Sequence, residues 1–482
     1  MSDMKLLLED SSFFRKCYIC CLFLCNISFL QIFSYIALPF IFIWGALLML
    51  KNEMRYRGFY NIKYGIWIIT FILSTVLTSV YYLFDNFLFN ILMIFHVAIC
   101  FFIFYGLHNE RNKNHKAELF SICKAIIYLT LVCGITGIVL LLCGVSFEFL
   151  WIKFIIYENR FTGVYINPNL LGFISVVSVF CCHIVSKEKF IQASGYKKLK
   201  TPLVAACIII NLISLFLCDS NSSLVFFVCY VLFSAFYKSI SFEKYCFNKK
   251  TILKSIFITV SSVIIITSVF ATRYFCQSGF SFLMVKAAEV TQDMTHQSVF
   301  DLDISQNLTT FTHENKNFDS GRIKLIKNSA NLFLKYPILG VGRGNIIEYS
   351  KRYVEDGVLD YNLNFNDIHN GYITILISSG ILGFSAFAIF GFKLGKNIIM
   401  TLLQKRETFK NTEVPCEASF LCAYLVFACF EKALLYDISI MVMLFWLILG
   451  HISCILRDQE NEETALQAEQ LLYQQQQCRE RI

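Results

Sequence analysis

His369 is the residue in this chain whose type and setting best suit general acid–base chemistry. It lies in Asp367-Ile-His-Asn-Gly-Tyr, directly before an apolar run that begins near residue 371. A neutral imidazole accepts a proton close to pH 7, so it suits the role of a general base. Asp367 is a candidate to orient the ring. The alternative interpretation of His369 is a polar residue at the edge of a membrane, without chemistry.

Two arginines at similar boundaries have the chemistry of phosphate binding. Arg322 follows Asp-Ser-Gly at the start of a helical pattern, where free N–H groups and the helix dipole attract anions. A guanidinium adds bidentate phosphate binding. Arg160 precedes the Asn-Pro-Asn turn at residues 167–169. Taken alone, Arg322 fits a contact with a lipid headgroup equally well, and Arg160 fits one better.

Several reaction classes have no support in the sequence. The glycine-rich stretch at residues 340–344 lacks the preceding strand and the spacing of a dinucleotide site. There is no P-loop, no Gly-x-Ser-x-Gly elbow and no metal-ligand spacing, so we expect no cofactor and a metal-independent reaction. Few charges lie within the apolar runs. This weakens the interpretation of the chain as an ion-coupled transporter, because such proteins usually bury ionisable groups in the membrane.

The composition is that of a membrane protein. Of the 482 residues, 56% are hydrophobic and 16% are charged, and the mean hydropathy is +0.59. Soluble domains are about 25% charged. The apolar residues form runs of roughly 18–25 residues, enough for a helix to cross a bilayer. We predict an all-α polytopic membrane protein with about twelve transmembrane helices, at residues 13–30, 33–50, 62–83, 88–107, 119–143, 167–186, 201–217, 222–240, 251–271, 371–393, 416–434 and 437–456.

The basic residues predict how these helices cross the membrane. Every second connecting segment carries several Lys or Arg residues, whereas the short turns at 84–87 and 218–221 carry none. The positive-inside rule then places both termini in the cytoplasm. The net charge of +8 is explained by this pattern, and we expect no nucleic-acid partner. Most of the cysteines lie within apolar runs and act as small hydrophobic residues, without a disulfide framework.

The topology divides the chain into four regions. Residues 1–271 hold helices 1–9, and residues 272–370 form a large extracytoplasmic loop. Residues 371–456 hold helices 10–12, and residues 457–482 form a cytoplasmic tail rich in Gln and Glu, expected to be a short helix or disordered. Within the loop we predict an amphipathic helix on the outer membrane surface, with Ser320 as its N-cap and Pro337 at its end. Its apolar positions are Ile323, Ile326, Ala330 and Phe333.

Three motifs in this order resemble the O-antigen ligase and O-antigen (or capsule) polymerase superfamily, which are bacterial inner-membrane glycosyltransferases. The first two are Arg160-Phe-Thr-Gly163 with Asn167-Pro168-Asn169-x-x-Gly172, and Ser320-Gly321-Arg322 with Tyr336-Pro337-Ile338-x-Gly340-x-Gly342. The third is His369-Asn370-x-Tyr372 with Gly380-x-x-Gly383. The resemblance covers about residues 160–385, and none of the motifs is specific alone.

The resemblance implies a reaction and the residues that carry it. A glycan moves from undecaprenyl pyrophosphate to a sugar hydroxyl on the outer face of the membrane. Arg160 and Arg322 would hold the pyrophosphate and His369 would act as the base. Arg343, Asn169 and Asn370 are further candidates for substrate binding. The implied partners are the lipid-linked glycan, a glycan or lipid-A-core-type acceptor, the bilayer and, as a further candidate, a chain-length regulator.

One motif departs from the family. Many relatives carry an arginine in the patch after the seventh helix, where this chain has Asp219-Ser220-Asn221-Ser222-Ser223. A basic residue is therefore missing near the donor site, or it is supplied by Lys153 or Arg343.

Other functions stay open at this stage. We favour a polymerase over a ligase only slightly, because the motifs do not report the acceptor. A protein O-oligosaccharyltransferase belongs to the same reaction class. A flippase or exporter of lipid-linked glycan would need no base, and a scaffold would need no chemistry at all. The sequence does not give the sugar, the linkage, the acceptor, the Gram type of the host or the oligomeric state.

Overall fold

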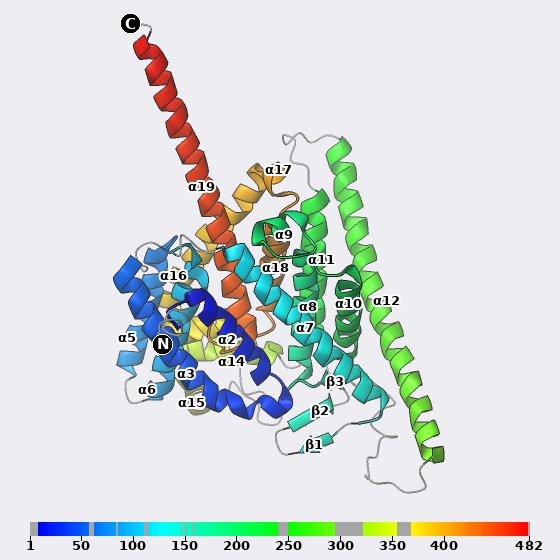
Figure 1. The fold of residues 1–482 in the computed structure, drawn as a ribbon. Helices are drawn as coiled ribbons and strands as arrows, with labels where there is room; N and C mark the ends of the chain where they lie inside the picture. Colours follow the sequence, from blue (N-terminus) through cyan, green and yellow to red (C-terminus); the bar gives the residue numbers. More distant parts are fainter. Residues whose placement is uncertain are drawn as a thin grey trace.

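The structure is a computed structural model that describes residues 8–56, 62–82, 85–109, 114–145, 147–149, 152–157, 160–239, 249–294, 322–353 and 368–480. It confirms an all-α polytopic membrane protein. Long helices pack side by side, and a small sheet lies at the end of the bundle opposite the C-terminus (Figure 1).

The first half of the chain contributes the following elements: α2 (Ser11–Cys25), η1 (Ser28–Leu30), α3 (Ile32–Tyr56), α5 (Gly65–Tyr81), α6 (Phe87–Ile99), η2 (Cys100–Tyr105), η3 (Gly106–Asn109), α7 (His115–Leu142), α8 (Pro168–Val185), α9 (Glu188–Ser194), α10 (Thr201–Leu217) and α11 (Asn221–Ser239). The second half contributes α12 (Lys249–Met294), α14 (Arg322–Lys335), η4 (Arg343–Asn345), α15 (Ile346–Tyr353), α16 (Gly371–Gln404), α17 (Arg406–Phe409), α18 (Val414–Phe427) and α19 (Ile440–Glu480).

Eleven of the twelve predicted spans overlap a helix that is apolar by length and composition, and the first span, at 13–30, overlaps α2, which is not among these helices. The first apolar run is divided, as the separate spans at 13–30 and 33–50 predict, because α2 ends at Cys25 and α3 begins at Ile32. Among the described residues, eight helices are long and apolar enough to cross a membrane, and three shorter apolar helices accompany them. The number of crossings, predicted as twelve, stays a prediction.

Two helices are longer than the sequence suggested. The span predicted to end at 271 continues as α12 to Met294, so the first part of the predicted loop is helical. With 46 residues, α12 is roughly 70 Å long. Likewise, α19 continues through the predicted tail to Glu480. Both helices project beyond the rest of the bundle, α12 at the edge and α19 at the end that carries the C-terminus (Figure 1).

A three-stranded antiparallel sheet was not predicted. It consists of β1 (Phe147–Phe149), β2 (Ile152–Tyr157) and β3 (Arg160–Gly163), paired in the order β1-β2-β3. A register shift interrupts the pairing of β2 and β3 at Ile155/Ile156. The sheet is the part of the fold that presents Arg160.

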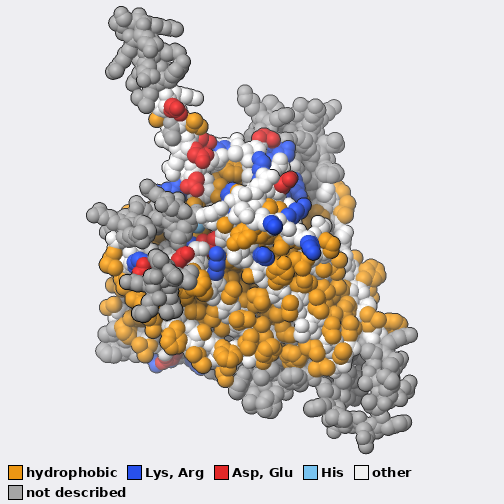
Figure 2. Space-filling view, in the orientation of Figure 1, with side chains coloured by type: hydrophobic (Ala, Val, Ile, Leu, Met, Phe, Trp, Pro, Cys, Tyr) orange, Lys and Arg blue, Asp and Glu red, His pale blue; other side chains and the backbone are white. Residues whose placement is uncertain are grey.

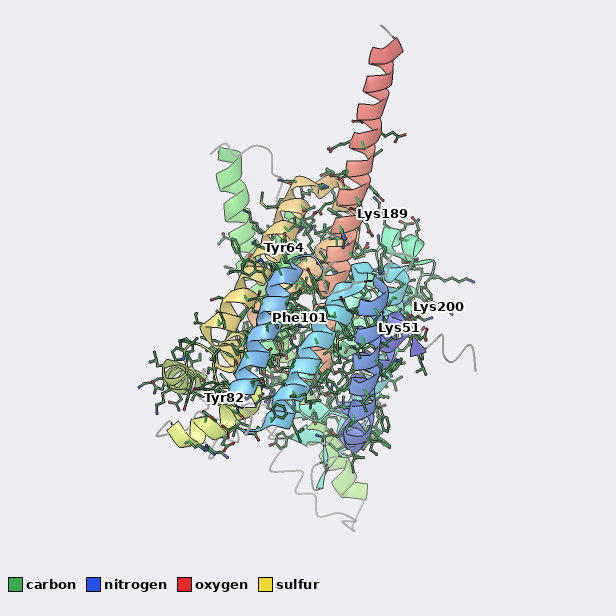
Figure 3. The ribbon with its side chains drawn as sticks, turned by 90° about the vertical axis from the view of Figure 1, so that its left-hand side faces the viewer. Lys51, Tyr64, Tyr82, Phe101, Lys189 and Lys200 are labelled. Carbon is green, nitrogen blue, oxygen red and sulfur yellow. The ribbon has the colours of Figure 1, made fainter. Side chains whose placement is uncertain are left out.

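The surface and the core agree with a membrane setting. A broad apolar band covers the visible face, and Lys and Arg side chains gather along its upper edge (Figure 2). Lys189 and Lys200 lie toward the end from which α19 projects, whereas Tyr82 lies at the opposite end (Figure 3). The core between η2, α16 and α19 is aromatic, with the Phe101 and Trp446 ring centroids 4.7 Å apart. Which end faces the cytoplasm stays a prediction.

A joint between two glycine-containing segments fixes the first part of α16. Gly380 interrupts the helix with φ +62°. The backbone before and around it pairs with residues 337–342, because Val341 N–H donates to the Ile377 carbonyl at 2.9 Å and Ile381 N–H to the Pro337 carbonyl at 2.8 Å. A Cβ on Gly380 would lie 2.1 Å from the Ile338 carbonyl oxygen. We call residues 337–342 and 377–382 the glycine joint.

The predicted amphipathic helix is present as α14. It ends at Lys335, two residues before Pro337, as expected. The positions buried against the protein are Leu325, Asn328, Ser329 and Leu332. Ile326 and Ala330, two of the predicted apolar positions, are exposed, and contact of this apolar face with the membrane surface stays a prediction. Ser320 lies outside the described residues.

Candidate functional site

The segment between α18 and α19, residues 428–439, holds the start of α16. Gly371 N–H donates to the Ala428 carbonyl at 2.8 Å. Asn370 Nδ2 donates to the Cys429 carbonyl at 2.9 Å, while its Oδ1 accepts from Ile373 N–H at 3.0 Å and so caps α16. Both ends of this amide therefore bond to the protein backbone. The structure gives Asn370 a positioning role, and its predicted contact with substrate stays a prediction.

His369 faces a carboxylate from the same α18–α19 segment. Its Nδ1 lies 3.4 Å from Glu431 Oε2. The His369 side chain is 24% exposed and that of Glu431 is 12% exposed. A proton on Nδ1 directed at the carboxylate leaves Nε2 as the basic nitrogen. Glu431 thus occupies the orienting position for which the sequence suggested Asp367, which lies outside the described residues.

His369 also has an unusual backbone conformation. Its φ of +50° lies in the left-handed region, which few residues other than glycine adopt. The hydrogen bonds of Asn370 and Gly371 to the α18–α19 segment hold the chain in this turn. Conformations of this kind are concentrated at functional sites, where the surrounding structure enforces them.

Glu431 connects His369 to the turn between α10 and α11. Its Oε1 accepts a hydrogen bond from Ser222 Oγ at 3.0 Å. Ser222 belongs to residues 218–223, which we call the α10–α11 turn and which contain the patch that departs from the family motif. One carboxylate therefore contacts both the candidate base and this turn.

Arg160 binds the same turn from the other side. Its Nε donates to the Cys218 carbonyl at 3.0 Å, and its Nη2 donates to Asn169 Oδ1 at 2.8 Å. Asn169 lies in the first turn of α8, where Asn167 Oδ1 caps the helix by accepting from Leu170 N–H at 2.8 Å. Arg160 and Asn169, predicted from one motif, are therefore in direct contact.

Of the other predicted basic residues, the structure describes the side chain of Arg343. Its Nε donates to the Tyr436 carbonyl at 3.3 Å, so it contacts the α18–α19 segment. Arg322 is the first residue of α14, and its side chain lies outside the described residues. The side chain of Lys153 in β2 does so too.

An aromatic cluster attaches α15 and the end of α14 to α5. Tyr349 packs against Tyr82 and Tyr336, with ring centroids 5.4 and 5.3 Å apart. Tyr82 marks the lower end of α5 in Figure 3. The Tyr349 hydroxyl donates to Asp85 Oδ2 at 2.6 Å, and burial together with this carboxylate raises the pKa of Tyr349. The cluster keeps the segment around Arg343 fixed on the bundle.

Comparison with known proteins identifies part of this chain. Residues 206–388 match the family model described as O-antigen ligase. The match supports the O-antigen ligase and polymerase superfamily, which the motifs resemble. No curated protein matches the chain. The matched range includes α14, the glycine joint and His369, whereas the first motif, at residues 160–172, lies before it.

Two residues of the site were missed by the sequence analysis, and only one of them lies within the O-antigen ligase match. Arg273 on α12 forms an ion pair with Asp219, and its Nη1 donates to Asn221 Oδ1 at 3.1 Å. The sequence feature that could have indicated Arg273 is an isolated charge within an apolar stretch. Glu431 lies beyond the matched range, in a segment without a recognisable pattern.

Proposed function

We propose that this protein transfers an oligosaccharide or polysaccharide from undecaprenyl pyrophosphate to a glycan hydroxyl on the outer face of the cytoplasmic membrane. The reaction is that of a repeat-unit polymerase or an O-antigen ligase. The O-antigen ligase match supports glycan transfer in general, and the specific donor follows from the resemblance. The observation that carries the proposal is the His369–Glu431 pair, which contacts the same turn as Arg160.

The chemistry follows from these side chains. His369 Nε2 takes the proton of the acceptor hydroxyl while that oxygen forms a bond to the anomeric carbon of the donor glycan. The bond between this carbon and the pyrophosphate oxygen breaks, and its electron pair leaves with the lipid pyrophosphate. Glu431 stabilises the resulting imidazolium, as a buried carboxylate does in other acid–base pairs. The proton then passes to the pyrophosphate or to water.

Arginines lower the barrier where negative charge develops. The leaving pyrophosphate gains charge in the transition state, and fixed cations placed beforehand stabilise it without reorganisation. Arg160 is held in place by Asn169 and by the Cys218 carbonyl, so it meets this requirement. We assign the second phosphate contact to Arg322, from its place at the N-terminus of α14.

The acceptor separates the two reactions in this class. A polymerase extends a lipid-linked chain, whereas a ligase attaches the chain to a glycan of the lipid-A-core type. We favour polymerisation, to which a chain-length regulator would be a partner. Deletion of the protein in its host tests this choice: single lipid-linked repeat units accumulate if polymerisation is lost, and long lipid-linked chains accumulate if ligation is lost.

Reconstitution tests glycan transfer itself. Purified protein in liposomes, supplied with lipid-linked glycan and acceptor, should form product, and His369→Ala should abolish it while flipping of the lipid-linked unit is unchanged. A flippase gives the opposite pattern, with translocation by the wild type and no product. Transfer to a protein hydroxyl but to no glycan would identify a protein O-oligosaccharyltransferase. Full transfer by His369→Ala would disprove the assignment of the base.

A further inference from the structure

Arg273 is an isolated charge on an apolar helix. It is the sole charged residue between Lys254 and Lys286. Its side chain is 16% exposed, whereas the next two residues, Tyr274 and Phe275, are 67% and 71% exposed. Within residues 255–285, helix α12 therefore turns its one charge toward the bundle and the neighbouring aromatic side chains of Tyr274 and Phe275 outward. An ionisable residue within an apolar helix is costly to bury, and such residues commonly mark functional sites.

The contacts of Arg273 bring it to the α10–α11 turn. It pairs with the Asp219 carboxylate and bonds to Asn221 Oδ1. Gln277, one helical turn further along α12, donates to Asp219 Oδ1 at 3.2 Å and to the Phe216 carbonyl at 3.0 Å. Asp219 has a φ of +51°, which aspartate tolerates better than most residues. The turn is thus shaped around the two side chains that α12 supplies.

Arg160 and Arg273 reach adjacent residues of this turn. Arg160 bonds to the carbonyl of Cys218, and Arg273 pairs with the side chain of Asp219. The two guanidinium groups come from β3 and α12. Guanidinium groups bind phosphate oxygens in bidentate fashion, and a diphosphate offers oxygens on two phosphorus atoms. Two arginines gathered at one turn suit such a group.

We propose that Arg273 binds the diphosphate of the lipid-linked donor together with Arg160. It supplies positive charge to a turn whose own residues, Asp219-Ser220-Asn221-Ser222-Ser223, include no cation. This inference rests on the proposed function, and it adds α12 to the donor site. Before the donor binds, Asp219 and Asn221 hold the guanidinium in place. The donor diphosphate then competes with Asp219 for it.

The opposing interpretation is structural. In that case Arg273 only attaches α12 to the bundle, and the Arg273–Asp219 pair acts as a unit. The two interpretations predict different effects on donor binding when the charge of Asp219 is removed. If the pair is structural, removing either charge has the same effect. If Arg273 binds phosphate, removing the arginine weakens donor binding, whereas removing the carboxylate leaves the arginine free for the donor.

The experiment measures binding of undecaprenyl pyrophosphate to the full-length protein in nanodiscs, together with the KM for the donor. Arg273→Gln should weaken binding by about 10- to 100-fold, as expected for loss of a charge-assisted hydrogen bond. Arg273→Lys should recover part of this loss. Asp219→Asn should bind as tightly as the wild type or more tightly. The matched control is Tyr274→Leu, which changes the exposed neighbour of Arg273 on the outward side of α12 and should leave binding unchanged.

Three results would overturn the inference. Binding by Arg273→Gln at the wild-type level does so, and so does equal weakening in Arg273→Gln, Asp219→Asn and Tyr274→Leu. If Arg273→Gln does not fold, Arg273→Lys must still raise the KM without lowering the unfolding temperature, and wild-type binding by the lysine variant contradicts the inference. Failure of the wild type to bind undecaprenyl pyrophosphate is a separate outcome, because it contradicts the proposed function as well.

Discussion

His369 Nδ1 lies 3.4 Å from Glu431 Oε2, although the two residues are 62 positions apart in the chain. His369 comes from the start of α16 and Glu431 from the segment between α18 and α19. The same carboxylate accepts a hydrogen bond from Ser222. The candidate base is thereby fixed relative to the α10–α11 turn, which in turn binds Arg160. This arrangement gives each contact a testable consequence.

We expect Glu431→Gln to reduce kcat while leaving the KM for the donor nearly unchanged. The amide keeps the size of the side chain but removes the negative charge that stabilises an imidazolium during proton transfer. General acid–base catalysis contributes about 10²–10⁴-fold to the rate. We therefore expect kcat to fall by about 10–100-fold when only the charge of the partner carboxylate is removed. Steady-state transfer by the reconstituted protein measures both parameters.

Two variants make the Glu431 prediction specific. Glu348→Gln removes a surface acid on α15 that pairs with Arg352, and it should leave transfer unchanged. Combining Glu431→Gln with His369→Ala should cost no more than His369→Ala alone, because the two residues act as one unit. Additive losses in the double variant, or a Glu431→Gln variant with full kcat, would contradict the orienting role.

We expect Asn169→Ala to raise the KM for the donor without abolishing transfer. Asn169 Oδ1 accepts from Arg160 Nη2 at 2.8 Å, and its loss lets the guanidinium move from the position that the pyrophosphate needs. A weakening of about 5- to 20-fold is expected for one hydrogen bond to a charged group. Asn169→Asp retains the acceptor oxygen and should restore the geometry, although its charge competes with the donor.

Donor titrations at several salt concentrations check this prediction. Arg160→Gln should reduce donor affinity more than Asn169→Ala does, because it removes the cation itself. If Asn169→Ala is neutral while Arg160→Gln is not, then the backbone contact to Cys218 suffices to hold Arg160. If both variants keep wild-type affinity, the first motif does not bind the donor.

We expect transfer to continue in the presence of a metal chelator. The positive charge that stabilises the leaving pyrophosphate is assigned here to arginine side chains, which need no ion. Activity measured with and without excess EDTA, after exchange into metal-free buffer, should agree within error. A loss that Mg²⁺ or Mn²⁺ restores would show that a divalent ion shares the pyrophosphate, and it would reduce the role of the arginines.

The helical frame was predictable because each apolar run has to satisfy its own backbone hydrogen bonds in lipid. The same argument does not fix where a helix ends in water. Helix α12 therefore continues to Met294, well past the predicted boundary at 271. The small sheet was missed because β2 reads as an apolar run with a lysine, without the clear alternation that marks a strand.

The candidate site was predictable only where local motifs mark it. His369 and Asn169 stand at helix starts, and Arg160 belongs to the motif that leads into α8, so all three have a recognisable setting. Glu431 was missed because its position depends on an irregular segment that bonds to residues far away in the chain. Arg273 was missed because its contact with Asp219 requires knowing which helices α12 packs against.

The glycine joint gives the most direct structural prediction: Gly380→Ala should destabilise the protein. Gly380 has a φ of +62°, and a Cβ there would lie 2.1 Å from the Ile338 carbonyl oxygen, which belongs to the paired backbone and has no room to move. A backbone strain of about 1–3 kcal/mol adds to this clash.

Gly391→Ala and Gly395→Ala are matched controls on the same helix, because a Cβ at either position meets no atom within 4 Å. Thermal unfolding in detergent should show a lower Tm for Gly380→Ala and an unchanged or slightly higher Tm for the two controls, since alanine favours a helix. Equal Tm values for all three variants would mean that residues 337–342 do not dock on α16, and the position of Arg343 would then be lost as well.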